Sequence, residues 1–286
     1  MKNILVPTDF SAHAEYAVQV AMEMAAKFGA TLHLLTCLDI SKWDISHSTK
    51  EEKSKYQDSL ELVNSAEKYF QQWKEVAHTQ HVAIKTSWVN GRLIPNIMTY
   101  TASQKIDGIV MGSHGTNQNF QSSLGSNTQR VIRRVNCPVF VIKSPLEKIT
   151  FSNVVFASGF DGSESEVIAE FLRFIQPFEP DVIHLLQIDT SPWFTSPKAP
   201  EKEVIKNYQT MVEKECRCET HLYTDYSIEA GIRHFSDDTQ VDLIVISNHH
   251  RRPWRQFLVG SNVEDLVRST ERPLLCFDYA SVKEPM

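Results

Sequence analysis

Two segments of the chain combine residue types that can hold an anionic ligand. The first is Pro7-Thr8-Asp9, where a carboxylate follows a short apolar run. The second is Gly112-Ser113-His114-Gly115, which is followed after nine residues by Gly125-Ser126-Asn127. Glycines let backbone N–H groups approach a ligand, and free N–H groups at the start of a helix favour an anion. The second segment therefore predicts a phosphate site, to which the hydroxyls of Ser126 and Thr128 would add donors.

Asp9 would supply a different contact. An ionised carboxylate only accepts hydrogen bonds, so it suits ribose hydroxyls or the amino group of a base. Taken one at a time, loop glycines are more commonly turn formers and a serine such as Ser126 is more commonly a helix cap. Their combination is what favours a ligand site.

The elements that must position these residues alternate between strands and helices. Ser11 is expected to cap the first helix and Gly29 to end it. Apolar runs predict strands at residues 4–6, 31–38, 82–89, 109–111 and 139–142, with helices at 12–28, 51–78, 93–104 and 127–135. Strands joined by helices require a parallel sheet with right-handed connections. Ligands of such sheets bind beyond the carboxyl ends of the strands where the strand order reverses, which is where both segments would lie.

The second half of the chain repeats the first. Residues 107–112 match 242–247 at an offset of 135, and residues 3–6 match 153–156 at an offset of 150. We therefore expect a tandem duplication with domains at 1–145 and 150–286. The strands of the second copy are expected near Val154, Ile183, Leu222, Ile244 and Leu275.

The second copy departs from the first at the candidate site. Ser247 stands in the place of Gly112, His250 in that of Gly115, and Gly159 near that of Asp9. The pair Gly260-Ser261 persists, and Arg251 and Arg252 could still attract an anion. We expect the ligand in the first copy only.

These motifs resemble those of the universal stress protein family. The pattern Gly-x2-Gly-x9-Gly-Ser, followed by a Cys-Pro-Val strand, and the opening Ile-Leu-Val-Pro-Thr-Asp carry the resemblance, which covers both halves. It implies two tandem five-stranded parallel-sheet α/β sandwiches of the adenine-nucleotide alpha-hydrolase-like type, with strand order 3-2-1-5-4. It also implies ATP or a related adenine nucleotide as ligand, with or without Mg²⁺.

The resemblance assigns a role to each matching position. The ribose and adenine would lie near Pro7, Thr8 and Asp9, with Cys37 or Leu38 lining the adenine pocket. The rest of the nucleotide would be surrounded by Met111, Gly112, His114 and Gly115, and its phosphates held by Gly125, Ser126 and Asn127. Asn127 departs from the family pattern, which commonly has a small β-branched residue there.

Composition excludes several functional classes. The net charge is −6, which argues against a nucleic-acid-binding surface. No apolar stretch is long enough to span a membrane, and the amino terminus does not resemble a signal peptide. Five cysteines, an odd number, predict reduced thiols and a cytoplasmic location. Residues 1–150 carry 16 Lys/Arg and 13 Asp/Glu, a net of +3, whereas residues 151–286 carry 13 and 22, a net of −9.

Other motifs that bear chemistry are weak. The sequence contains no P-loop, no dinucleotide fingerprint and no nucleophile elbow. The best metal candidate is the run Cys216-Arg217-Cys218-Glu219-Thr220-His221, but Cys216, Cys218 and His221 do not share one strand face. Zinc sites require convergent ligands, so we predict structural thiols and no metal.

Three functions remain in order of preference. The first is a nucleotide-binding stress or regulatory protein with little or no turnover and no assigned catalytic residue. The others are a slow ATPase and a nucleotide-free protein-interaction module. The apolar runs 138–142 and 273–277 would lie at sheet edges, which pair readily, so we expect an internal pseudo-dimer across them. A further homo-oligomer is left open.

Overall fold

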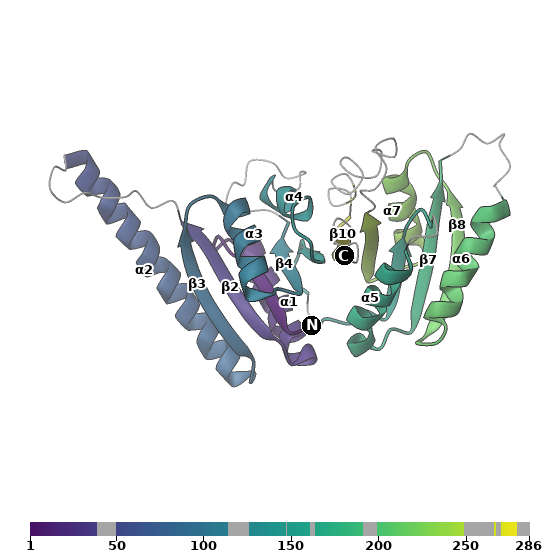
Figure 1. The fold of residues 1–286 in the computed structure, drawn as a ribbon, viewed down its shortest axis with the longest axis horizontal. Coiled ribbons are helices and arrows are strands. Elements are labelled where there is room, and N and C mark those ends of the chain that lie inside the picture. Colours follow the sequence, from purple (N-terminus) through teal and green to yellow (C-terminus); the bar gives the residue numbers. More distant parts are fainter. Residues whose placement is uncertain are drawn as a thin grey trace, which may run out of the picture. The chain divides into compact units, whose positions relative to one another are not determined.

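The computed structural model describes residues 1–38, 50–113, 126–146, 148–160, 164–190, 199–248, 266 and 270–278. These residues form an α/β protein with two compact units (Figure 1). The N-terminal unit contains the described residues up to Val135, and the C-terminal unit contains those from Asn136 onward.

The N-terminal unit is a parallel sheet with its strands in the order β3-β2-β1-β4. Its elements are β1 (Asn3–Pro7), α1 (Ala12–Phe28), β2 (Thr31–Leu38), α2 (Lys50–Thr79), β3 (Ala83–Asn90), α3 (Leu93–Gln104), β4 (Gly108–Gly112) and α4 (Ser126–Ile132). Of the elements expected in the first copy, the first four strands and all four helices lie in this unit. In β1 the side chains of Ile4, Leu5 and Val6 are fully buried, as an apolar run in a sheet covered on both faces should be.

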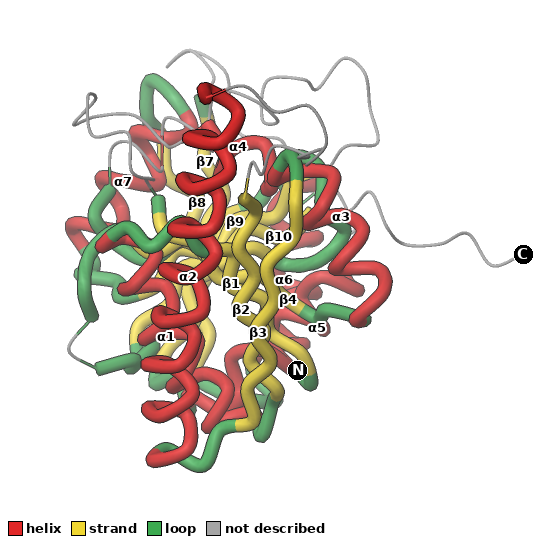
Figure 2. Tube along the Cα trace, turned by 90° about the vertical axis from the view of Figure 1, so that its left-hand side faces the viewer, coloured by secondary structure: helices red, strands yellow, loops and turns green. Residues whose placement is uncertain are grey.

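Helices cover both faces of this sheet. Helix α1 packs on β1, β2 and β4, and α2 packs on β2 and β3, where it runs beside the strands in Figure 2. Helix α3 contacts β1 and α4, and right-handed crossovers place it on the face opposite α1. Helix α1 begins and ends as expected: the Ser11 hydroxyl accepts a hydrogen bond from Ala14 N, and Gly29 has a left-handed φ of 61°.

In the C-terminal unit the strands follow the order β5-β10-β9-β6-β7-β8. Its elements are β5 (Val139–Ile142), β6 (Asn153–Ala157), α5 (Ser165–Ile175), the 3-10 helix η2 (Gln176–Phe178), β7 (Val182–Asp189), α6 (Ala199–Val212), β8 (Arg217–Thr224), α7 (Ile228–Asp238), β9 (Leu243–Asn248) and β10 (Leu274–Asp278). The strands β6 to β10 are mutually parallel where they pair. They match the five expected strands of the second copy.

The two fifth strands, β5 and β10, pair with each other. Their antiparallel register places Leu274 opposite Val141 and Cys276 opposite Val139. The expected pairing of these apolar strands is therefore confirmed, and β5 belongs by its contacts to the C-terminal unit.

The strand order implied by the family resemblance is wrong. In the second copy the first strand, β6, lies between the second strand, β7, and the fourth strand, β9. The order is thus 3-2-1-4-5. The fifth strand, β10, lies beyond the fourth, so the outer edge of β10 is available to pair with β5. This pairing buries both apolar strands.

Among the helices that the structure describes, none combines the length and apolar character that a bilayer-spanning segment requires.

Candidate functional site

The point where the strand order reverses lies between β1 and β4 in the N-terminal unit. Strand β1 pairs with β2 on one side and with β4 on the other. The connections leaving β1 and β4 therefore diverge, and the space beyond their carboxyl ends is where open parallel sheets bind ligands. Thr8 and Asp9 follow β1, and Gly112 ends β4, so both expected segments start at this edge of the sheet.

Hydrogen bonds fix the loop that follows β1. Thr8 N donates to Leu35 O at 2.9 Å, and the Thr8 hydroxyl accepts from Phe10 N at 3.1 Å. Phe10 has a φ of 65°, a conformation that few side chains adopt. The Asp9 carboxylate accepts from Ser11 N at 3.1 Å and is exposed. The loop thus holds an acceptor carboxylate at the start of α1 and beyond the end of β1.

Gly112 brings the end of β4 against helix α1. A Cβ atom at this position would lie 2.6 Å from the carbonyl carbon and oxygen of His13. The Gly112 carbonyl accepts from the Thr128 hydroxyl at 2.8 Å, which fastens α4 to β4. Thr128 is buried, and its one hydroxyl hydrogen is used in this bond. Donation from Thr128 to a phosphate, which would require this bond to be replaced, stays a prediction.

Strand β2 extends past β1 and forms a wall beside the site. Pro7, the last residue of β1, lies opposite Leu35, so Cys37 and Leu38 continue beyond it. Leu38 is buried and Cys37 is half-buried. Burial raises the pKa of the Cys37 thiol, which keeps it neutral. Met111 differs from these two: it lies in β4 and is 5% exposed, as a core residue would be.

Several predicted site residues cannot be placed. His114, Gly115 and Gly125 lie outside the described residues, as do His250, Arg251, Arg252, Gly260 and Ser261 of the second copy. Ser126 is the first residue of α4, and Asn127 is exposed on the same helix. Their assignment to phosphates stays a prediction.

Tyr69 of α2 is a residue at this site that sequence reasoning missed. Its ring packs against Phe10, with centroids 4.8 Å apart. Its hydroxyl is buried and makes no hydrogen bond of normal geometry with a described residue. Burial raises the pKa of Tyr69, its polar neighbours Thr8 and Trp73 lower the pKa in part, and the nearby carboxylates of Glu15 and Asp9 raise it. This end of the site is therefore electronegative and contains a buried hydroxyl beside the loop, a combination that the sequence of a long polar helix does not reveal.

Comparison with known proteins shows to which family the chain belongs. The profile of the universal stress protein family matches residues 1–143 and 162–278. The chain belongs to the universal stress protein family. It is 26% identical to the universal stress protein Slr1230 of Synechocystis, over 97% of this chain and all of that one. It is 31% identical to the universal stress protein MJ0531 of Methanocaldococcus jannaschii, over 50% of this chain and 83% of that one.

A solved structure shares the fold over nearly the full length. The universal stress protein from Archaeoglobus fulgidus superposes with a TM-score of 0.72 at 15% identity, covering 96% of both chains. At this level of identity the likeness concerns the fold alone. The double family match is what indicates two universal stress protein copies in one chain.

The C-terminal unit of this universal stress protein closes the equivalent position with its own side chains. Ser158 follows β6 as Thr8 follows β1, and Phe160 has a positive φ of 47°, like Phe10. The carboxylate of Glu164, fully buried, accepts from the Ser158 hydroxyl at 2.9 Å and from the Tyr208 hydroxyl at 3.2 Å. The ring of Tyr208 packs against Phe160, with centroids 5.8 Å apart, in the way that Tyr69 packs against Phe10. In the C-terminal unit a buried carboxylate thus accepts from the hydroxyl of the tyrosine that packs on the loop.

The two cysteines of the run weighed as a metal candidate do not belong to a group of converging metal ligands among the described residues. Cys218 is buried in β8, and burial raises its pKa to about 12, which opposes the thiolate form that metals bind. Cys216 precedes the strand, and its thiol donates to Arg217 O at 3.5 Å.

Proposed function

We propose that this chain is a stress-response or regulatory protein that binds ATP or a related adenine nucleotide in its N-terminal unit, with little or no turnover. The observation that carries this proposal is the exposed Asp9 carboxylate at the reversal point of the strand order, beside a β4 terminus that packs directly on α1. Membership of the universal stress protein family supports a stress-related role.

Each part of the site suits one part of the nucleotide. Asp9 would accept from the ribose hydroxyls, and Cys37 or Leu38 would line the adenine pocket. The electronegative surroundings of Asp9 and Glu15 favour neutral hydroxyls and the base there over phosphates. The phosphates, with or without Mg²⁺, would then lie toward β4, near Gly112, His114, Gly115 and the start of α4 at Gly125, Ser126 and Asn127.

Calorimetric titration with ATP tests this proposal. Asp9→Ala should weaken ATP binding by about tenfold to a hundredfold, because hydrogen bonds to charged groups contribute roughly 1.5–3 kcal/mol. Glu23→Ala is the matched control, since it removes an exposed carboxylate from α1 away from the loop. Equal weakening by both variants would point to a general charge effect, and no weakening by Asp9→Ala would remove Asp9 from the site.

Nucleotide identity and turnover are measured on the same protein. Mass analysis of the small molecules released from the purified chain should find an adenine nucleotide, and ADP formation from added ATP should be very slow. Steady ADP production that Asp9→Ala abolishes would establish the slow ATPase instead. No released nucleotide and no effect of ATP on the melting temperature would favour the interaction module. None of the five cysteines forms a disulfide in the described structure, which supports a cytoplasmic location for this role.

A further inference from the structure

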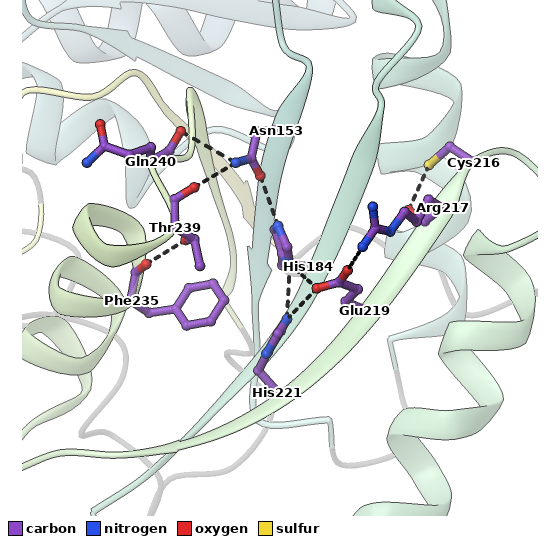
Figure 3. A network of polar contacts seen from close by, with 9 residues as sticks. All are labelled: Asn153, His184, Cys216, Arg217, Glu219, His221, Phe235, Thr239 and Gln240. Atoms are coloured by element: carbon purple, nitrogen blue, oxygen red, sulfur yellow. Dashed lines mark hydrogen bonds and ion pairs between the residues drawn. The ribbon is translucent and has the colours of Figure 1, made fainter.

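Three side chains on two adjacent strands of the C-terminal unit converge on one point. His184 of β7 lies opposite Glu219 of β8, and His221 is two residues further along β8 on the same face. His184 Nδ1 lies 3.0 Å from His221 Nε2 (Figure 3). Glu219 Oε2 lies 3.6 Å from the first of these nitrogens and 3.7 Å from the second. Among the described residues, this is the group whose ligand atoms could surround one metal ion.

Neighbouring residues fix the orientation of His184. Asn153 Nδ2 donates to Thr239 O at 2.8 Å, so Asn153 Oδ1 is the atom that faces His184 Nε2, at 2.9 Å. An amide oxygen only accepts, so His184 Nε2 carries the hydrogen. Nδ1 therefore has its lone pair directed at the point of convergence. Ligating histidines commonly donate their other N–H to such an outer partner.

Glu219 is held with one oxygen free for a metal. Its Oε1 atom is paired with the guanidinium of Arg217. This contact turns Oε2 toward the two imidazoles, as Figure 3 shows. The ring of His221 packs against Phe235, with centroids 4.7 Å apart, which restrains the third ligand.

We propose that His184 Nδ1, His221 Nε2 and Glu219 Oε2 form a binding site for a divalent transition metal of the Zn²⁺ class. Two imidazoles and a carboxylate suit zinc and its neighbours better than Mg²⁺ or Ca²⁺, which prefer oxygen ligands. Ligand atoms at zinc distances in a tetrahedral site lie roughly 3.4 Å apart, close to the separations found here. The proton that His221 Nε2 shares with His184 in the metal-free protein would move to His221 Nδ1.

The site is open on one side. The side chain of His184 is 7% exposed, whereas those of His221 and Glu219 are 28% and 34% exposed. A metal can therefore enter from solvent and would keep a fourth position for water or a small ligand, the arrangement that three-ligand zinc sites have.

The N-terminal unit provides an internal control. His33 has the same setting as His184, with its Nε2 atom 3.2 Å from Asn3 Oδ1. Its Nδ1 atom, however, faces the Tyr100 hydroxyl at 3.1 Å. Lys85 lies opposite His33 in β3, at the register position that Glu219 has in β8. A cation in place of the carboxylate disfavours metal binding, so we expect one metal per chain.

Titration of the chelator-treated full-length protein with Zn²⁺ tests the site. We expect about one equivalent of Zn²⁺ to bind and to raise the melting temperature, and Co²⁺ to give the absorption spectrum of a tetrahedral site. Glu219→Gln and His221→Gln should each weaken binding by at least about tenfold. His33→Gln should bind like the wild type.

The same variants also show which results would contradict the proposed metal site. Both altered side chains are partly exposed, and Glu219→Gln keeps the shape of the residue, so a circular dichroism spectrum like that of the wild type is expected. Folded variants that retain full Zn²⁺ affinity would overturn the assignment, because the ion would then bind elsewhere in the chain. Failure of the wild type to bind Zn²⁺ at micromolar concentrations would overturn it as well.

Discussion

Gly112 ends β4 within contact distance of the backbone of helix α1. A Cβ atom there would lie 2.6 Å from the His13 carbonyl, and backbone atoms within a helix cannot move aside cheaply. Gly112→Ala should therefore lower the free energy of unfolding by about 1–3 kcal/mol, the usual cost of overpacking. Gly159→Ala is the matched control, because its Cβ would meet nothing within 4 Å. Urea denaturation measures the free energy of unfolding of both variants. Equal values would show that α1 shifts to make room for the added methyl group.

His33 makes stability depend on pH. It is fully buried, and burial together with the charge of Lys85 lowers its pKa from 6.5 to about 4. The unfolded chain therefore binds more protons between these values, so the stability present above pH 6.5 is lost as the pH falls toward 4. The loss from this group should reach about 2 kcal/mol at pH 5.

His33→Gln isolates this contribution. The other titrating groups, His184 and His221 among them, remain in both proteins and cancel in the comparison. The free energy of unfolding should fall less between pH 7.5 and pH 5 in the variant than in the wild type. Parallel pH profiles would show that His33 does not carry the effect.

At the scale of elements, helix α1 depends on its N-cap residue, Ser11. The Ser11 hydroxyl satisfies Ala14 N at 3.3 Å. Ser11→Ala should lower the free energy of unfolding by about 1 kcal/mol, as loss of a cap does. Ser103→Ala removes an exposed hydroxyl from the last turn of α3 and should change stability by less than about 0.5 kcal/mol. Thermal unfolding compares the stability of the two variants. If Ser11→Ala were as stable as the control Ser103→Ala, water would be satisfying the N–H group that Ser11 caps.

The same local signals explain which elements could be predicted. Ser11 and Gly29 define the ends of α1 because a cap and a left-handed residue act within one turn. Short apolar runs identified the strands because sheets covered on both faces bury every side chain. The pairing of β5 with β10 was expected because each apolar strand would otherwise lie at an unpaired sheet edge. The structure contains this pairing.

Features that depend on register could not be predicted. His184 and Glu219 are 35 positions apart and meet only because β7 and β8 pair in one register. In the sequence, the close spacing of Cys216 and Cys218 suggested a metal site. The informative signal was instead the alternation Glu219-x-His221, which places two ligand side chains on one face of β8. Tyr69 and Glu164 were missed for a similar reason, since each acts on a loop that tertiary packing brings to it.

At the scale of the whole molecule, the two copies have diverged in charge and in the content of their equivalent sites. Residues 1–150 carry a net charge of +3 and residues 151–286 a net charge of −9, so an anion favours the first copy. In the C-terminal unit the Glu164 carboxylate already uses the hydroxyls of Ser158 and Tyr208. Ser247, in the place of Gly112, adds a side chain where the first copy has none.

This divergence predicts one nucleotide per chain. A nucleotide entering the C-terminal unit would meet the buried Glu164 carboxylate at its ribose end, and its phosphates would lose the contacts that the glycines of the first copy allow. Losing two hydrogen bonds to a charged group, at roughly 1.5–3 kcal/mol each, weakens binding more than a hundredfold. Calorimetric titration with ATP should therefore saturate near one equivalent, whose affinity Asp9→Ala should lower by about tenfold to a hundredfold and Glu164→Gln should leave unchanged. Arg251 and Arg252 could oppose this by attracting phosphate, but ordering two long side chains costs entropy, so we expect them to compensate only in part. Saturation at two equivalents of similar affinity, or a single equivalent whose affinity Asp9→Ala leaves unchanged, would place a nucleotide in the C-terminal unit after all.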